Sequence, residues 1–260
     1  MSGPQLIVER DGPIARVIFS NPAAHNALTH QMWLDLRDAC EGFAVDRSVR
    51  VVTFRGVGGK AFISGTDISG FADFKTGDDG LEYEREIDTC MASIDALPMT
   101  TIAIVEGWAV GGGLNISSAC DFRIATPNSR FGSPIGRTLG NCLSISSTAR
   151  IAGAIGVQTA KRMVLLGEMI AAPEMLANGF LLKVVTAEEI DAVAAELCQR
   201  AAENAPLTTR TTKEAARRLT FGNLPNIEPL IEAVYGSADF HRGVANFLAK
   251  TKTTPTWTGD

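Results

Sequence analysis

The chain has 260 residues, of which 45% are hydrophobic, and it carries a formal net charge of −5 at pH 7. This apolar fraction is enough for a packed core, while the acidic balance and the lack of a basic run argue against nucleic acid or anionic membranes as partners. The N-terminus shows no signal-peptide pattern, and no run approaches the about 18 apolar residues of a membrane helix. We therefore expect a cytoplasmic protein.

The cysteines and histidines indicate neither a disulfide framework nor a metal site. The five cysteines are scattered and form no Cys-x-x-Cys, so we expect them to be core thiols of a reducing compartment. The three histidines, His25, His30 and His241, are isolated from one another. No metal-ligand set is predicted.

The first half of the chain alternates short apolar runs with helical patterns. Residues 6–9 and 14–19 are expected to form a hairpin, and Thr29 is a candidate N-cap for the helix that follows. Further strands are expected at residues 49–55, 61–63, 101–105 and 122–125, and a helix at residues 81–97. Residues 71–80 combine charges with glycine, which favours a mobile loop.

Beyond Ser129 the pattern is mostly helical. Helices are expected at residues 143–154, 158–166, 173–178, 188–204, 207–219 and 227–250, with a strand at residues 181–185. Residues 251–260 are polar and are expected to trail over a surface. The rhythm of two strands and a helix in the first half predicts an α/β core with a helical C-terminal extension.

A glycine-rich turn stands between the strand at residues 101–105 and a short apolar helix. Gly107 ends the strand, and Gly111, Gly112 and Gly113 lead into the helix. The first N–H groups of a helix lack internal partners, and the helix dipole adds partial positive charge there. Such a turn can hold an oxygen that becomes negative during a reaction, although spacing alone fits an ordinary tight turn equally well.

Five motifs, in order and at these spacings, resemble the crotonase (enoyl-CoA hydratase/isomerase) superfamily. They are Asn21-Pro22-x-x-His25-Asn26-Ala27-Leu28, Ala61-Phe62-Ile63-Ser64-Gly65-Thr66-Asp67-Ile68, Gly107-x-Ala109-x-Gly111-Gly112-Gly113, Cys120-Asp121 and Phe131-Gly132-Ser133-Pro134. The resemblance extends to the late segment Asn246-Phe247-Leu248-x-Lys250. It implies a crotonase-type spiral of β-β-α turns over residues 1–200 and a C-terminal helical trimerisation region over residues 201–260.

The resemblance also implies an enoyl-CoA hydratase/isomerase family enzyme, a homotrimer or dimer of trimers. It would act on acyl-CoA thioesters, with no cofactor beyond the coenzyme A of its substrate. Two backbone N–H groups, at the positions of Thr66 and Gly112, would hold the thioester oxygen while an enolate forms, and one such donor is typically worth ~2.7–4 kcal/mol.

Other motif positions are expected to line the substrate path. Those matching the adenine, pantetheine or acyl path are Ser64, Gly65, Asp67, Ile68, Gly111, Ser133, Pro134 and Phe247. His25 and Lys250 match basic positions near the coenzyme A phosphates. From its own sequence context, Asp67 is interpreted as a turn residue that accepts hydrogen bonds from nearby N–H groups.

The sequence departs from the family at both acid/base positions of the hydratases. Asn115 stands where one glutamate is expected, three residues after Gly112, and Ile135 stands where the other follows Pro134. Neither side chain exchanges a proton near neutral pH, although Asn115 could orient a water or a hydroxyl group. The two-glutamate mechanism of hydration therefore does not carry over.

Three interpretations remain open. Glu84, at the edge of the apolar stripe of the helix at residues 81–97, could enter the site as a relocated acid/base, or it could be one solvated acid among several. Arg137 could bind a substrate carboxylate, as decarboxylation of a carboxyacyl-CoA would require, or form a loop salt bridge. The protein could also bind acyl-CoA without catalysis.

Overall fold

The structure is a computed structural model that describes residues 3–224, 226–250 and 257–258. Its core contains a six-stranded sheet, with strand order β1-β2-β3-β5-β7-β10. The β1–β2 hairpin is antiparallel and the remaining pairs are parallel. The strands are β1 (Gln5–Asp11), β2 (Ile14–Ser20), β3 (Val51–Gly56), β5 (Thr100–Val105), β7 (Phe122–Ala125) and β10 (Lys183–Val184).

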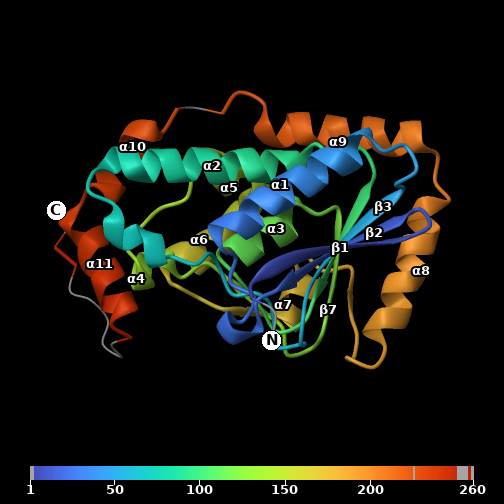
Figure 1. The fold of residues 1–260 in the computed structure, drawn as a ribbon, viewed down its shortest axis with the longest axis horizontal. Helices are drawn as coiled ribbons and strands as arrows, with labels where there is room; N and C mark the ends of the chain where they lie inside the picture. The colour runs from blue at the N-terminus through green and yellow to red at the C-terminus, as the bar shows by residue number, and fades with distance from the viewer. Residues whose placement is uncertain (1–2, 225, 251–256, 259–260) are drawn as a thin grey trace.

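A second sheet of four short strands has the order β4-β6-β8-β9. These strands are β4 (Ala61–Ile63), β6 (Trp108–Val110), β8 (Arg130–Gly132) and β9 (Ile170–Ala171). Each of β3, β5 and β7 in the large sheet is followed directly by a strand of the small sheet and then by a helix. Successive β-β-α turns therefore stack, which is the spiral expected from the sequence (Figure 1).

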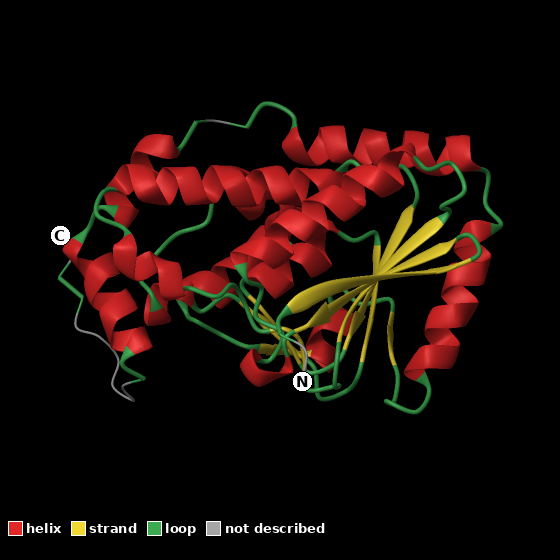
Figure 2. Cartoon of the chain, in the orientation of Figure 1, coloured by secondary structure: helices red, strands yellow, loops and turns green. Residues whose placement is uncertain are grey.

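Helices cover both faces of the large sheet (Figure 2). On one face lie α1 (His30–Val45), α2 (Gly77–Asp95) and α3 (Gly112–Ala119), and on the other lies α8 (Ile190–Ala202). Neighbouring strand residues alternate between the two cores, since Val52 packs in the larger cluster and Val51 in the cluster beneath α8. This burial on both faces explains the continuous apolar runs of the parallel strands.

Several local predictions are confirmed. The hairpin forms as expected, and the Thr29 hydroxyl accepts the N–H of Met32 at 3.2 Å as the N-cap of α1. Four of the five cysteines are buried thiols, and Cys142 is half-buried. The helices of the second half also follow the predicted order. They are α5 (Ile145–Ile155), α6 (Val157–Leu165), α7 (Ala172–Ala177) and α9 (Pro206–Phe221) besides α8. A further short helix, α4 (Ile135–Thr138), precedes them.

The predicted loop at residues 71–80 is wrong. Phe71 is buried within a 3-10 helix, η2 (Ser69–Asp73), and α2 begins at Gly77. Gly77 and Gly80 lie where a later helix, α10 (Glu228–Tyr235), crosses α2 closely, and a Cβ added at Gly80 would overlap the ring of Tyr235. The glycines therefore serve close helix packing rather than loop flexibility.

Two other predictions need correction. Residues 227–250 form two helices, α10 and α11 (Ala238–Leu248), because the chain turns at Gly236 and the Ser237 hydroxyl caps α11 by accepting the Phe240 N–H at 3.1 Å. The short strands β6, β8 and β9 and the helix α4 do not appear among the expected elements. Their two to four residues are too few to show a period in the sequence.

The C-terminal helices pack on their own chain. Side chains of α10 and α11 form a cluster with η2, α2 and α4 at the end of the molecule opposite α8 (Figure 1). The expected trimer contacts of residues 201–260 remain a prediction. Within the polar tail at residues 251–260, only Trp257 and Thr258 lie in the described part of the chain, and the Trp257 ring lies close to Gly140 and Gly243.

Candidate active site

The first of two adjacent turns follows β4 and carries Thr66. Thr66 forms an isolated parallel bridge with Leu28. The bridge consists of two backbone hydrogen bonds. The Leu28 N–H donates to the Gly65 carbonyl at 2.9 Å, and the Asp67 N–H donates to the Leu28 carbonyl at 2.8 Å. The N–H of Thr66 has no acceptor within the described residues.

The second turn follows β6 and ends at Gly112, the first residue of α3. The N–H of Gly112 likewise has no acceptor in the described part of the chain, as expected for the first turn of a helix. Gly111 before it has a φ of +52°, which glycine adopts without a steric penalty. A Cβ added at Gly112 would lie 3.4 Å from Oγ1 of Thr66, so the two turns are direct neighbours.

Both turns open into a cavity of about 180 Å³, here called the central cavity. It lies between the two turns and side chains of α2, α3, α4 and α11. Most of the predicted site residues line it. These are Ser64, Gly65, Thr66, Ile68, Glu84, Gly111, Gly112, Asn115, Ser133, Pro134 and Phe247.

Four predicted site residues lie outside the central cavity. His25 is exposed, and its carbonyl accepts the Ser64 N–H at 3.2 Å. Asp67 lines a neighbouring cavity of about 450 Å³, and its carboxylate accepts the Ser69 N–H at 2.9 Å, which confirms its interpretation as a turn residue.

Arg137 and Lys250 are the other two. Arg137 is exposed on α4, with its guanidinium beside Gly167. Lys250 is exposed directly after α11, and its N–H donates to the Phe247 carbonyl at 3.0 Å. Phe247 itself is 49% exposed at the edge of the cavity. The structure thus brings Lys250 near the cavity rim and leaves Arg137 away from its lining.

Glu84 is the one carboxyl group among the described residues that line the central cavity. It is only 5% exposed, so the interpretation of Glu84 as a solvated surface acid is wrong. The Tyr235 hydroxyl donates to Oε1 at 2.6 Å, and the Ser144 N–H donates to Oε2 at 2.9 Å. Burial raises the pKa of Glu84 to about 7, with these two hydrogen bonds opposing the rise and Asp88 adding to it.

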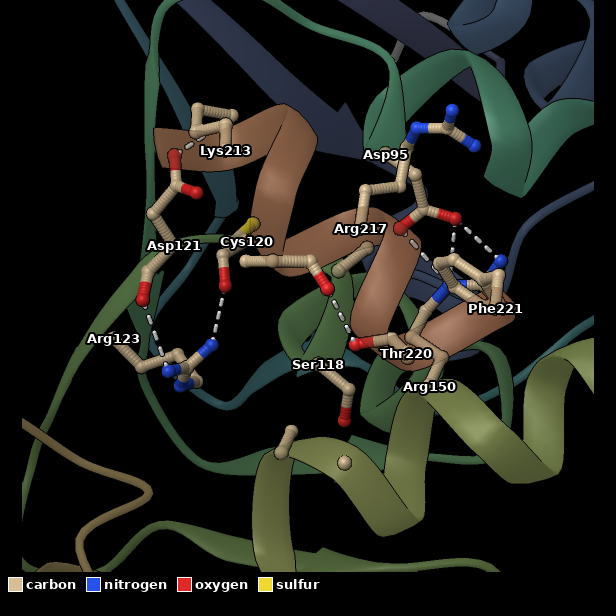
Figure 3. Close-up of a pocket in the computed structure, with 14 residues that line it drawn as sticks. Asp95, Ser118, Cys120, Asp121, Arg123, Arg150, Lys213, Arg217, Thr220 and Phe221 are labelled. Atoms are coloured by element: carbon tan, nitrogen blue, oxygen red, sulfur yellow. Dashed lines mark hydrogen bonds and ion pairs between the residues drawn. The ribbon is translucent and has the colours of Figure 1, made fainter. Parts of the chain in front are cut away.

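Asn115 is held rigidly at the other side of the cavity. Its Nδ2 donates to Oγ of Ser147 at 2.9 Å, and its Oδ1 accepts from Nη1 of Arg150 at 3.1 Å. Arg150 in turn forms a bidentate pair with Asp95, whose shortest N–O distance is 2.6 Å (Figure 3). The Asn115 amide therefore has a fixed orientation and no titratable proton.

Two neutral polar atoms in the cavity wall lack partners. Oγ of Ser133 and Oδ1 of Asn141 are buried and form no hydrogen bond within the described chain, and both residues line the central cavity. Buried polar atoms are normally hydrogen-bonded. These two atoms are therefore available to a polar group of a ligand or to water.

A separate cavity of about 210 Å³ lies beneath α9, and two buried charged residues, Arg123 and Arg150, line it (Figure 3). Lys213 of α9 pairs with Asp121 at 2.6 Å, and Arg150 pairs with Asp95. The Arg123 guanidinium donates to the carbonyls of Ser117, Cys120, Asp121 and Phe180. The pair with Lys213 fixes α9 to the body of the molecule, which gives Asp121 of the Cys120-Asp121 motif a structural role.

Sequence reasoning did not identify Tyr235 and Asn141 as site residues. Tyr235 lies 151 residues from the carboxyl group to which it donates, so no local pattern connects them. The scarcity of tyrosine is a signal that the sequence does carry. The chain has two tyrosines, Tyr83 and Tyr235, and both lie beside Glu84 in a buried aromatic cluster.

Within the described residues, no group of three or more His, Cys, Asp or Glu side chains is placed to hold a metal ion. None of the helices in that part of the chain is long and apolar enough to cross a membrane.

Comparisons with known proteins agree with this architecture. The sequence pattern of the family described as enoyl-CoA hydratase/isomerase matches residues 9–259. A short-chain-enoyl-CoA hydratase of Clostridium acetobutylicum is 32% identical over 214 residues, which are 82% of this chain and 81% of that protein. A crotonyl-CoA hydratase of Syntrophomonas wolfei is 28% identical over 257 residues, which cover 97% of this chain and 98% of that protein.

Among solved structures, methylmalonyl-CoA decarboxylase in complex with 2-nitronate-propionyl-CoA superposes with a TM-score of 0.89 at 25% identity and covers 100% of both chains. The family match over nearly the whole sequence, together with the stacked β-β-α turns, establishes the relationship. The chain belongs to the enoyl-CoA hydratase/isomerase family of the crotonase superfamily.

Proposed function

We propose that the protein is an enzyme of acyl-CoA thioesters that stabilises an enolate with the N–H groups of Thr66 and Gly112. Both donors lack an acceptor among the described residues, lie on adjacent turns and belong to residues that line the same cavity. Removing a proton next to a thioester carbonyl places negative charge on its oxygen. Fixed backbone donors stabilise that charge without reorganising.

Glu84 is proposed as the group that moves the proton. It is the single carboxyl group among the described residues of the central cavity, and this observation carries the proposal. A pKa of about 7 suits a group that must both accept and return a proton near neutral pH. Asn115 and Ile135 cannot take this role, because neither side chain titrates there.

One proton carrier favours migration of a double bond over addition of water. Starting from a 3-enoyl-CoA, the Glu84 carboxylate removes a proton from C2, and the electron pair moves onto the thioester oxygen between the two N–H groups. Glu84 then delivers a proton to C4, the C2–C3 double bond forms and the carboxylate is regenerated. The step balances without water or any co-reactant. Hydration would need a second positioned group, and Ile135 offers none.

The test is an absorbance assay of the purified protein with two substrates. Trans-3-hexenoyl-CoA should gain the absorbance of a conjugated thioester, and crotonyl-CoA should lose little of it. Glu84→Gln should abolish the gain, whereas Glu82→Gln, an exposed acid on the same helix, should not change it. Isomerisation that survives Glu84→Gln, or efficient hydration of crotonyl-CoA, would reject this assignment.

Decarboxylation of a carboxyacyl-CoA is the second candidate. Its support is the similarity to methylmalonyl-CoA decarboxylase over the full length of both chains. Against it, no lysine, arginine or histidine occurs among the described residues that line the central cavity, so a substrate carboxylate would have no cationic partner there. Carbon dioxide release from methylmalonyl-CoA, unaffected by Glu84→Gln, would favour this candidate over isomerisation.

A further inference from the structure

Glu84 lies in the wall between two cavities. One is the central cavity, and the other, here called the outer cavity, has a volume of about 310 Å³ and lies between α2, the start of α5 and the start of α10. Besides Glu84, the outer cavity is lined by Asp88, Ser144, Ser146 and the ion pair between Arg85 and Glu228, whose N–O distance is 2.7 Å. A group with access to both cavities can receive a proton on one side and release it on the other.

Asp88 is the acid nearest to Glu84 on the outer side. It lies one helical turn further along α2, so the two carboxyl groups are on the same face of the helix. Ser144 contacts both, because its N–H donates to Oε2 of Glu84 at 2.9 Å and its hydroxyl donates to Oδ1 of Asp88 at 2.7 Å. The hydroxyl groups of Ser144 and Ser147 both donate to Oδ1 and hold the half-buried Asp88 carboxyl group at this wall.

We infer that Asp88 exchanges the Glu84 proton with solvent through the outer cavity. This inference rests on the proposed role of Glu84. A proton taken from the substrate onto Glu84 moves through a water molecule in the outer cavity to the Asp88 carboxylate and then to bulk water, and a solvent proton returns by the reverse steps. No electron transfer and no other reactant is involved.

The geometry favours this route over the mouth of the central cavity. A thioester that fills the central cavity would separate Glu84 from that mouth, and the cavity wall is largely apolar, with Ile68, Ile87 and Ile135 among its residues. The outer cavity also has apolar residues in its wall, but its carboxyl groups, together with the hydroxyl groups of Ser144 and Ser146, provide the several polar partners that a water molecule needs. Burial also raises the pKa of Asp88, which brings it closer to that of Glu84 and makes transfer between them more even.

The experiment follows deuterium during isomerisation in deuterium oxide. Trans-3-hexenoyl-CoA is converted by wild type and Asp88→Asn, and each sample is analysed for the rate of the absorbance change and for deuterium at C4 of the product by mass spectrometry. The wild type should place deuterium in most product molecules. Asp88→Asn keeps an acceptor for Ser144 but has no exchangeable carboxyl proton. It should therefore retain turnover, while its product carries about tenfold less deuterium at C4 per turnover than that of the wild type.

Glu228→Gln is the matched control, because Glu228 lines the same outer cavity without contacting Ser144 or Glu84 through any described hydrogen bond. The product made by Glu228→Gln should carry as much deuterium at C4 as the product made by the wild type. If Asp88→Asn is poorly folded, the pair Asp88→Glu and Asp88→Gln gives the same comparison, with the label kept by the glutamate variant alone. If Asp88 had only a structural role, its variants would change the isomerisation rate but not the amount of deuterium that each turnover places at C4.

The outcomes separate this inference from the proposed function. Unlabelled product from the wild type, or a label unchanged in Asp88→Asn, overturns the exchange route while isomerisation stands. Absence of any turnover that depends on Glu84 overturns the proposed function, and the exchange route with it.

Discussion

At the scale of single residues, the site depends on backbone atoms at one end and on a buried carboxyl group at the other. The Thr66 and Gly112 donors are main-chain groups, so the side chains at these positions are free to vary. The Thr66 hydroxyl is used elsewhere and accepts the indole N–H of Trp33 at 3.3 Å. The Glu84 carboxyl group, in contrast, depends on side chains from distant parts of the chain.

Gly112→Pro tests the second donor directly. Gly112 is the first residue of α3, where proline is well tolerated because its missing N–H would have no helical partner. The variant should fold, bind acyl-CoA and lose about 10²–10³-fold in kcat, since one oxyanion donor is removed. Gly112→Ala is the matched control: it introduces the same Cβ, 3.0 Å from the Trp33 ring, but keeps the N–H, so it should retain most of the rate once that ring has shifted slightly. Isomerisation kinetics of both variants decide the point, and full activity of the proline variant would contradict the assignment.

Glu84 gives folding a pH dependence of defined sign. Its pKa is about 7 in the folded protein against an ordinary 4.5, because burial disfavours the charged form. Between these values the folded state binds more protons than the unfolded state, so its contribution to stability is complete below pH 4.5 and is lost as the pH rises towards 7.

Glu84→Gln should therefore be more stable than the wild type above neutral pH by up to about 3 kcal/mol, and the difference should shrink as the pH is lowered. Urea unfolding at several pH values measures this. Glu82→Gln is the control on the exposed face of α2 and should follow the wild type throughout. A stability difference that does not vary with pH would show that the Glu84 pKa is not shifted.

At the scale of elements, the crossing of α2 and α10 builds the carboxyl site. Gly77 and Gly80 let α10 approach, and this approach brings the Tyr235 hydroxyl to Glu84. The cluster around the crossing includes Phe71, Phe240 and Tyr235, whose rings pack at centroid distances of 4.8–6.4 Å. The position of the acid is therefore a consequence of helix packing.

Gly80→Ala should destabilise the protein despite the better helix propensity of alanine. The new Cβ would overlap the Tyr235 ring, so α10 must shift, at a cost of about 1–3 kcal/mol, and the hydrogen bond to Glu84 should weaken. Gly42→Ala in α1 has open space and should instead stabilise by about 0.5–1 kcal/mol. Thermal and urea unfolding of the two variants give the comparison, and equal effects would argue against a packing role for Gly80.

The same crossing shows how much of the molecule was predictable. The hairpin, the Thr29 cap and the turns at Thr66 and Gly112 are local features, and their residues are sufficient to predict them. The burial of Glu84 is not local, because Tyr235 and Ser144 come from other segments. Gly77 and Gly80 misled the assignment of residues 71–80 for the same reason, since a glycine at a helix crossing and a glycine in a loop look alike in one sequence.

At the scale of the whole molecule, different interactions attach α9 and the pair α10–α11 to the rest of the chain. The pair α10–α11 is fixed by an apolar and aromatic cluster, whereas α9 has no fully buried residue and is held by charged contacts. Large apolar side chains remain exposed on α9, including Leu207 at 74% and Leu219 at 88%. Single exposed leucines are common on protein surfaces and do not by themselves mark an interface. The trimer expected for this region therefore stays a prediction, which sedimentation of the purified protein would test.

Lys213→Met should loosen α9 without harming catalysis. The Lys213 ammonium group donates to the Asp121 carboxylate at 2.6 Å and to the Met99 carbonyl at 2.8 Å, and it ties α9 to the residues just before β5 and β7 (Figure 3). Methionine keeps most of the apolar stem but leaves the mostly buried Asp121 carboxylate with its hydrogen bonds from Thr101 alone, which should cost about 1–3 kcal/mol. Arg210→Met, at an exposed position of the same helix, should change stability little. Because Lys213 does not line the central cavity, kcat/KM at a temperature where both variants are folded should equal that of the wild type. A large loss of activity in Lys213→Met with unchanged stability would mean that α9 acts on the site rather than on the fold.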